Sequence, residues 1–175
     1  MSTALISIIC EDRAGLIAAV TGRLYDLEIN LADTSFAVLG GGAEFTLVAK
    51  LPERLTLEEL EDELKSLPEL EGSKLTVTSF SYRESHGESG SITHRIEITG
   101  DDSPGLIARL SEAFPTFGAN IVLLNSQSVP GASGAGFLLR LAIWVPEDKA
   151  PACLATVANT AGQMNLKCRW WKHVW

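Results

Sequence analysis

Two stretches of the chain decide the fold: ALISIICEDRAGLIAAVTGRLYDLEIN at residues 4–30 and HRIEITGDDSPGLIARLSEAFPTFGAN at residues 94–120. Shifted by 90 positions, these 27 residues align without a gap and share eight identities. Chance would give roughly two. The similarity resumes further along the chain, where Phe45 corresponds to Phe137 and Pro52-Glu53 to Pro146-Glu147. The chain therefore contains two copies of one unit, each about half its length.

A segment rich in Gly and Ser, SHGESGS at residues 85–91, joins the two copies. Such a composition is typical of a short flexible linker. We therefore expect a first domain over residues 1–84, a linker over 85–91 and a second domain over 92–175. Charge divides unevenly, because residues 1–87 hold 7 basic and 15 acidic residues while residues 88–175 hold 7 of each. The copies thus share a scaffold but differ in surface.

The sequence pattern of each copy predicts the order strand, helix, strand, strand, helix, strand. β-Branched residues are typical of strands at 4–10 and 92–100, and apolar residues at helical spacing follow in both copies. Gly40-Gly41-Gly42 indicates a hairpin in the first copy, and the longer segment 130–136 takes its place in the second. The pattern also predicts helices over 57–67 and 148–161, and last strands over 74–83 and 165–174. Two helices on one face of an antiparallel sheet make a two-layer α+β fold of the ferredoxin-like type, present twice in tandem.

Capping residues and prolines refine the helix boundaries. Thr56 is suited to cap the helix that starts at residue 57. In the second copy, Pro104 suits the first helical position, with Ser103 as the cap before it. Pro115 falls near the end of the same helix, where it is expected to kink or shorten the helix.

Composition and charge exclude several classes of protein. A net charge of −8 and a pI near 4.9 argue against direct contact with nucleic acid, which depends on clustered Lys and Arg. The three cysteines form no C-x-x-C pair, so a disulfide framework or a zinc ribbon is not expected and a reducing compartment fits. The longest apolar stretches, 4–10 and 137–145, are too short to span a bilayer, and the N-terminus lacks the pattern of a secretory signal. We expect a cytoplasmic protein without a membrane segment.

The strongest site candidate is the turn between the first strand and the first helix of each copy, EDRAGL at 11–16 and DDSPGL at 101–106. A helix N-terminus offers unpaired N–H groups that suit a carboxylate, and a nearby Asp suits an ammonium group. Gly would allow close approach of a ligand. Together these features describe a site for a free amino acid. A simpler interpretation also fits, in which Asp caps the helix and Gly relieves a tight turn.

These residues resemble a known family. A unit of this order, with Asp-x-Pro-Gly-Leu-Ile after the first strand and Asn at the start of the second, is similar to an ACT domain. Residues 102–107 and Asn120-Ile121 carry the pattern, whereas the first copy has Ala14 in place of Pro. Two such domains in one chain resemble the glycine cleavage system transcriptional repressor family, and the stretch ADTSFAVLG at 32–40 is also similar to it.

The resemblance implies a site at the seam between paired domains, where the loop of one domain faces the second strand of the other. The residues implied for the first site are Asp12, Ala14, Gly15, Leu16, Asn120 and Ile121. Those implied for the second site are Asp102, Pro104, Gly105, Leu106, Asn30 and Leu31. The alternative role for both Asn residues is a turn before a strand. The implied ligand is glycine or a similar small amino acid, with Pro104 favouring the second site.

The resemblance further implies a non-enzymatic regulator, a repressor that acts by contact with a transcription factor. The residues show no phosphate loop, nucleophile elbow or metal-ligand spacing, so no catalytic residue, metal or cofactor is expected. A subunit that docks on a metabolic enzyme is the main alternative, and a homodimer is compatible with either role. An acylphosphatase is a third hypothesis, which would use Arg13 and Asn30.

Two surface features remain without an assigned role. The C-terminal strand mixes basic residues with tryptophans, which could stack on nucleobases but more simply cover apolar surface or a partner. An acidic run at residues 58–63 is either a solvated helix face or a docking surface for a basic partner.

Overall fold

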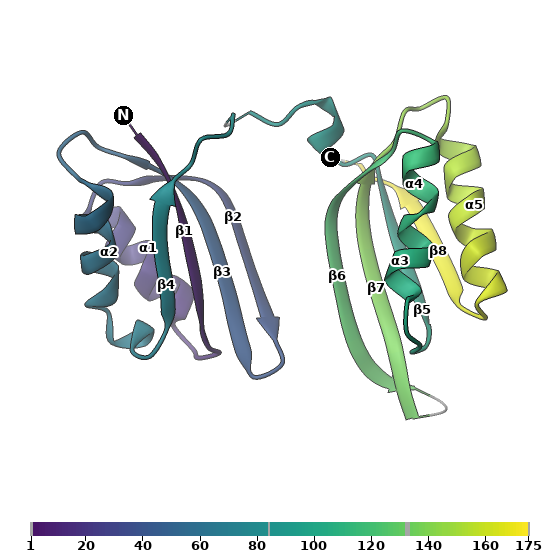
Figure 1. Cartoon of the computed structure of the whole chain (residues 1–175), viewed down its shortest axis with the longest axis horizontal. Coiled ribbons are helices and arrows are strands. Elements are labelled where there is room, and N and C mark those ends of the chain that lie inside the picture. The colour runs from purple at the N-terminus through teal and green to yellow at the C-terminus, as the bar shows by residue number, and fades with distance from the viewer. Residues whose placement is uncertain (1, 84, 132–133, 175) are drawn as a thin grey trace. The chain divides into compact units, whose positions relative to one another are not determined.

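The computed structural model describes residues 2–83, 85–131 and 134–174, and the chain divides into two compact units, residues 1–84 (unit 1) and 85–175 (unit 2). Over the described residues, each unit forms one antiparallel four-stranded sheet. The strand order is β2-β3-β1-β4 in unit 1 and β6-β7-β5-β8 in unit 2, and the helices of each unit cover one face of its sheet (Figure 1). This confirms the predicted tandem ferredoxin-like fold of two antiparallel sheets with helices on one face.

Unit 1 follows the predicted order of elements. Its elements are β1 (Ser2–Glu11), α1 (Leu16–Asp26), β2 (Asn30–Leu39), β3 (Gly42–Leu51), α2 (Leu57–Lys65), a 3-10 turn η1 (Pro68–Leu70) and β4 (Lys74–Ser79). The central strand β1 is paired on both sides, and its side chains at alternate positions, Ala4, Ile6 and Ile8, are fully buried. They pack against Leu16, Val20 and Leu24 of α1 and Leu60 and Leu64 of α2.

Unit 2 repeats this order with one helix divided. Its elements are a 3-10 turn η2 (Glu88–Gly90), β5 (His94–Asp101), α3 (Leu106–Ser111), α4 (Ala113–Thr116), β6 (Asn120–Gly131), β7 (Gly134–Trp144), α5 (Ala150–Gln163) and β8 (Lys167–Lys172). Its core pairs Ile96, Ile98, Leu139 and Leu141 of the sheet with Leu110, Phe114, Leu154 and Val157 of the helices.

Pro115 divides the first helix of unit 2, as the sequence predicted. Proline has no N–H to donate to the carbonyl four residues earlier, and its ring clashes with that carbonyl. For Pro115 that carbonyl belongs to Ser111, which is the residue where α3 ends. Unit 1 has Tyr25 at the corresponding position and forms the continuous helix α1.

The predicted role of Pro104 and Ser103 is wrong. Helix α3 begins at Leu106, so Pro104 precedes the helix and Ser103 does not cap it. Gly105 is the N-cap residue and has φ 85°, a left-handed conformation that glycine adopts without steric cost. Gly15 has the same role in unit 1, with φ 92°.

Two connecting segments also differ from the prediction. Strands β6 and β7 extend into the expected loop 130–136, where Pro130 pairs with Ala135 and Gly131 with Gly134. Residues 132–133, which belong to the expected loop, lie outside the residues that the structure describes. Within the expected linker, Glu88–Gly90 forms the 3-10 turn η2, and the Ser89 carbonyl accepts a hydrogen bond from the Asn120 side chain at 2.9 Å.

Candidate functional site

The loop between the first strand and first helix has the same backbone arrangement in both units. The Asp12 N–H donates to the Gly41 carbonyl, and the Asp102 N–H donates to the Ala135 carbonyl, both at 3.2 Å. These bonds tie each loop to the neighbouring hairpin. Neither α1 nor α3 has a side-chain hydrogen bond at its N-cap. The interpretation in which Asp caps the helix is therefore wrong for both loops, although the need for Gly at the turn is real.

In unit 2 this loop borders a hollow with a volume of about 250 Å³. Its walls come from the loop, the start of α3, and one face of β6 and β7. The lining residues are Asp102, Ser103, Gly105, Leu106, Ile107, Ala108, Ser126, Ser128 and Phe137. The volume falls below the range of about 300–1,000 Å³ that is typical of pockets for drug-sized ligands. The hollow therefore suits a small molecule.

The hollow brings a carboxylate and hydroxyl groups to one place. Asp102 can accept hydrogen bonds from an ammonium group, while Ser103, Ser126 and Ser128 can donate to a carboxylate. Helix α3 has six residues, so its macrodipole is short and the individual N–H and hydroxyl groups must provide the recognition. This arrangement can hold a small zwitterion, and it contains no nucleophile paired with a base among the described lining residues.

Three predicted residues of unit 2 line this hollow, namely Asp102, Gly105 and Leu106, whereas Pro104 does not. Leu106 is 3% exposed and belongs mainly to the core, as Leu16 does in unit 1. Ser126 and Ser128 were not predicted. They face the helix side of the sheet because a bulge between Ile121 and Leu123 sets the register of β6, and bulges leave little trace in a sequence.

Asn120 and Ile121 lie at the opposite end of β6 from the Asp102 loop. Asn120 pairs with Trp144 in the ladder, whereas Ser128 pairs with Phe137 beside the loop. The Asn120 amide donates to the Ser89 carbonyl, and Ile121 packs against the core of unit 2. In unit 1, Asn30 is exposed and Leu31 is partly buried against the core. The pairing of these residues with the loop of the other copy stays a prediction.

Unit 1 differs from unit 2 where the hollow would be. Phe36 stands opposite Phe45 in the ladder, as Ser128 stands opposite Phe137, so Phe36 and Ser128 hold equivalent places. The rings of Phe36 and Phe45 meet edge to face with centroids 5.6 Å apart. An aromatic ring thus occupies the place that a hydroxyl group holds in unit 2. The loop of unit 1 also places Arg13 beside Glu11, 3.9 Å apart.

The chemistry available near these loops is limited. Burial raises the pKa of the Cys10 thiol, with a smaller opposing effect from Arg13, so the group stays protonated at neutral pH. Among the described residues, no group of three or more His, Cys, Asp or Glu side chains is placed to hold a metal ion. No helix in the described part of the chain has both the length and the apolar character needed to cross a membrane.

The residues of the acylphosphatase hypothesis do not meet within unit 1. Arg13 follows the end of β1 at Glu11, which pairs with Gly42. Asn30 pairs with Lys50, which lies opposite Thr3 at the other end of β1. The two side chains therefore belong to opposite ends of the sheet and do not form the pair that this hypothesis requires.

Comparison with known proteins agrees with this architecture. The family model of the ACT domain matches residues 4–69. An unknown protein from Galdieria sulphuraria has a crystal structure that aligns with a TM-score of 0.76 at 18% identity, covering 99% of each chain. A protein described as "putative glycine cleavage system transcriptional repressor" aligns with a TM-score of 0.68 at 13% identity, covering 98% of this chain and 97% of that one. A search of curated protein sequences found no match.

Both structures cover the two units together, so the tandem arrangement of domains is shared along with the fold of each unit. The match to the ACT family model lies within the first unit, and the second unit repeats the strand order of the first.

Proposed function

We propose that this protein is a non-enzymatic regulator that senses a small free amino acid, glycine or one of similar size. The hollow beside Asp102 carries the proposal, because it combines an acceptor for an ammonium group with hydroxyl donors for a carboxylate in a volume of about 250 Å³. The ACT domain in unit 1 supports it, since the sequence resemblance implies amino-acid binding for this family.

The signal passes to a partner protein in the cytoplasm, which we take to be a transcription factor. The similar fold of a protein described as "putative glycine cleavage system transcriptional repressor" supports this choice over a metabolic enzyme. The chain has a net charge of −8, which disfavours direct binding to DNA. Repression would therefore act through contact between proteins.

Thermal unfolding in the presence of each common amino acid tests the proposal. A ligand at 100 times its Kd adds about 2.7 kcal/mol to the free energy of unfolding. For a chain of this size such a gain raises Tm by roughly 5–10 °C. We expect glycine or a similarly small amino acid to produce such a shift, and large amino acids to produce none.

Two variants test whether the shift in Tm comes from binding beside Asp102. Asp102→Asn removes the charge that would hold the ammonium group, and we expect it to abolish the shift in Tm. Asp101→Asn is the matched control, since Asp101 is the exposed last residue of β5 and does not line the hollow. The absence of a shift with every amino acid at millimolar concentration would contradict the proposal.

A further inference from the structure

Strand β8 (Lys167–Lys172) is an edge strand with hydrogen-bonding groups directed outward. Within residues 2–83, 85–131 and 134–174 it pairs with β5 alone. The His173 N–H donates to the Thr93 carbonyl, so the alternation of an antiparallel ladder places the bonds to β5 at Lys167, Arg169 and Trp171. The N–H and C=O groups of Cys168, Trp170 and Lys172 therefore point away from the sheet.

This edge is basic on a chain that is acidic overall. The sequence of β8 is KCRWWK, with three cationic residues and no acidic one, whereas the chain has a net charge of −8. Glu97 lies opposite Arg169 in the ladder, but its carboxylate pairs with Arg140 at 3.3 Å. Lys172 lies 3.5 Å from Glu147, and both side chains are mostly exposed, so this ion pair is weak.

Two large aromatic side chains stand on the same strand. Trp170 is 49% exposed and Trp171 is 47% exposed. Because side chains alternate along a strand, the two indole rings lie on opposite faces of the sheet. Exposed apolar surface of this size beside an open strand edge is typical of an interaction site.

A groove lies beside Trp170, on the face of the sheet that α5 covers. Its volume is about 500 Å³, and its walls include His94, Pro151, Leu154, Trp170 and Lys172. His94 is 92% buried, and burial lowers its pKa, with a smaller effect of Lys172 in the same direction, so its ring is neutral at pH 7. A side chain opposite Trp170 on an added strand would point to this face. The groove can therefore receive an apolar side chain.

We propose that β8 binds an acidic, extended segment of a partner protein, which joins the sheet as an additional strand. The backbone of the segment would hydrogen-bond with Cys168, Trp170 and Lys172, its carboxylates would meet Lys167 and Arg169, and an apolar side chain would enter the groove. Backbone bonds supply affinity in this mode of recognition, and pockets for alternate side chains supply specificity.

Charge disfavours a second copy paired through its own β8, since that pairing would bring cationic residues together. The edge strand of unit 1 offers a contrast, because β4 has the sequence KLTVTS with one cationic residue and no tryptophan. The inference does not depend on amino-acid binding at the Asp102 loop.

Fluorescence anisotropy tests the proposal with a labelled heptapeptide of alternating glutamate and valine. We expect saturable binding to the full chain that weakens as salt is raised. Trp170→Pro removes an outward N–H without removing a bond to β5, and should weaken binding at least tenfold. Ser79→Pro is the matched control, because the Phe80 N–H donates to the Thr3 carbonyl and the N–H of Ser79 therefore points outward from β4. It should leave binding unchanged.

A second variant keeps the test decisive if Trp170→Pro unfolds unit 2. Lys167→Gln combined with Arg169→Gln leaves the backbone intact, and should weaken binding and reduce its dependence on salt. The proposal is overturned if the peptide does not bind, if a lysine and valine peptide binds equally well, or if neither variant changes the affinity. Binding of a dT oligonucleotide in preference to the acidic peptide would also overturn it and would assign the edge to nucleic acid.

Discussion

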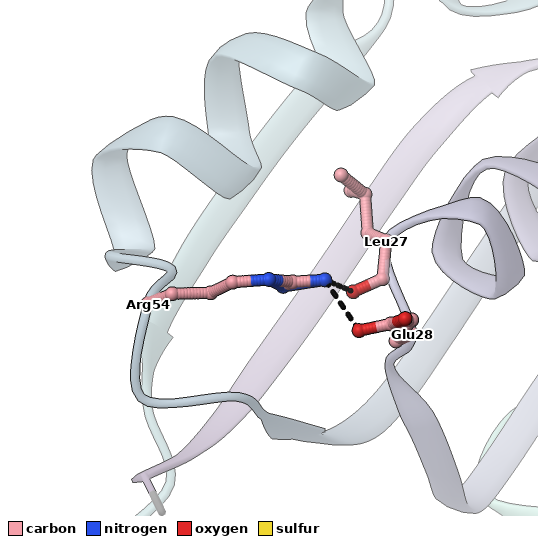
Figure 2. A network of polar contacts seen from close by, with 3 residues as sticks. All are labelled: Leu27, Glu28 and Arg54. Carbon is pink, nitrogen blue, oxygen red and sulfur yellow. Dashed lines mark hydrogen bonds and ion pairs between the residues drawn. The ribbon is translucent and has the colours of Figure 1, made fainter.

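At the scale of single residues, the turn after the first helix has a left-handed residue at the same position in both copies, but the two copies use different residue types there. Glu28 has φ 58°, and Gly118, which occupies the same place in unit 2, has φ 63°. Glycine adopts this left-handed conformation without cost, whereas other residues pay about 1–2 kcal/mol. In unit 1 the Arg54 guanidinium donates to the Leu27 carbonyl at 3.4 Å and to the Glu28 carboxylate at 2.6 Å (Figure 2). Arg54 thus holds the strained turn in place.

A double-mutant cycle on this turn follows from that geometry. Glu28→Gly should leave the free energy of unfolding unchanged or raise it by up to about 1 kcal/mol, because the relief of strain exceeds the value of an exposed ion pair. Arg54→Ala should lower it by about 0.5–1 kcal/mol in the natural chain and by less in the Glu28→Gly background. Chemical denaturation of the four proteins measures this coupling. Equal effects of Arg54→Ala in both backgrounds would show that Arg54 does not act through Glu28.

At the scale of elements, helix α2 has a complete capping box. The Thr56 N–H and hydroxyl both donate to the Glu59 carboxylate, at 2.8 and 2.9 Å, and the Glu59 N–H donates to the Thr56 hydroxyl at 3.2 Å. The first of these bonds, from the backbone, and then the bond from the hydroxyl hold the pKa of Glu59 below its usual value. The acidic face of the same helix is partly neutralised within unit 1, where Arg23 lies 3.5 Å from Glu63.

Thr56→Ala should lower the free energy of unfolding by about 1 kcal/mol at pH 7. Because the pKa of Glu59 is lower in the folded chain, its contribution is present at neutral pH and is lost as pH falls through the folded-state pKa. Thr56→Ala keeps the bond from the backbone N–H to the Glu59 carboxylate and removes the bond from the hydroxyl, so the difference between the two proteins should shrink in part as pH falls through that pKa. Thr21→Ala is the control, since the Thr21 hydroxyl donates to the Ile17 carbonyl on an exposed part of α1. A loss for Thr56→Ala that stays constant from pH 7 to pH 3 would contradict this account.

The elements also show what a sequence can and cannot predict. Thr56 bonds to a residue within one helical turn, and Pro115 prevents such a bond, so the cap of α2 and the break after α3 were predictable. Gly105 has a left-handed φ, so α3 begins at Leu106 and not at Pro104. The motif alone did not indicate this conformation. Ser126 and Ser128 face the helix side of the sheet because the pairing of β6 shifts by one residue between Ile121 and Leu123.

At the scale of the whole molecule, the internal repeat made the fold predictable, because eight identities at one offset define two copies of the same unit. The repeat does not make the copies equivalent. Phe36 in unit 1 and Ser128 in unit 2 occupy the same position in their ladders, yet one is a ring packed on Phe45 and the other lines a hollow. Both units share the motif of the loop between the first strand and the first helix. The residue that stands beside this loop, Phe36 or Ser128, lies outside the motif and differs between the units.

The most direct test of the account is a calorimetric titration of glycine, alanine and serine into the full chain and two variants. Ser128→Phe places in unit 2 the residue that unit 1 has, and should weaken binding at least tenfold by filling the hollow. Gln127→Phe adds the same ring to the neighbouring position, whose side chain lies on the other face of β6, and should leave the affinity unchanged. Binding by the natural chain that Ser128→Phe removes and Gln127→Phe retains is the predicted result. An affinity that Ser128→Phe leaves unchanged, or no heat with any of the three amino acids, would contradict the account.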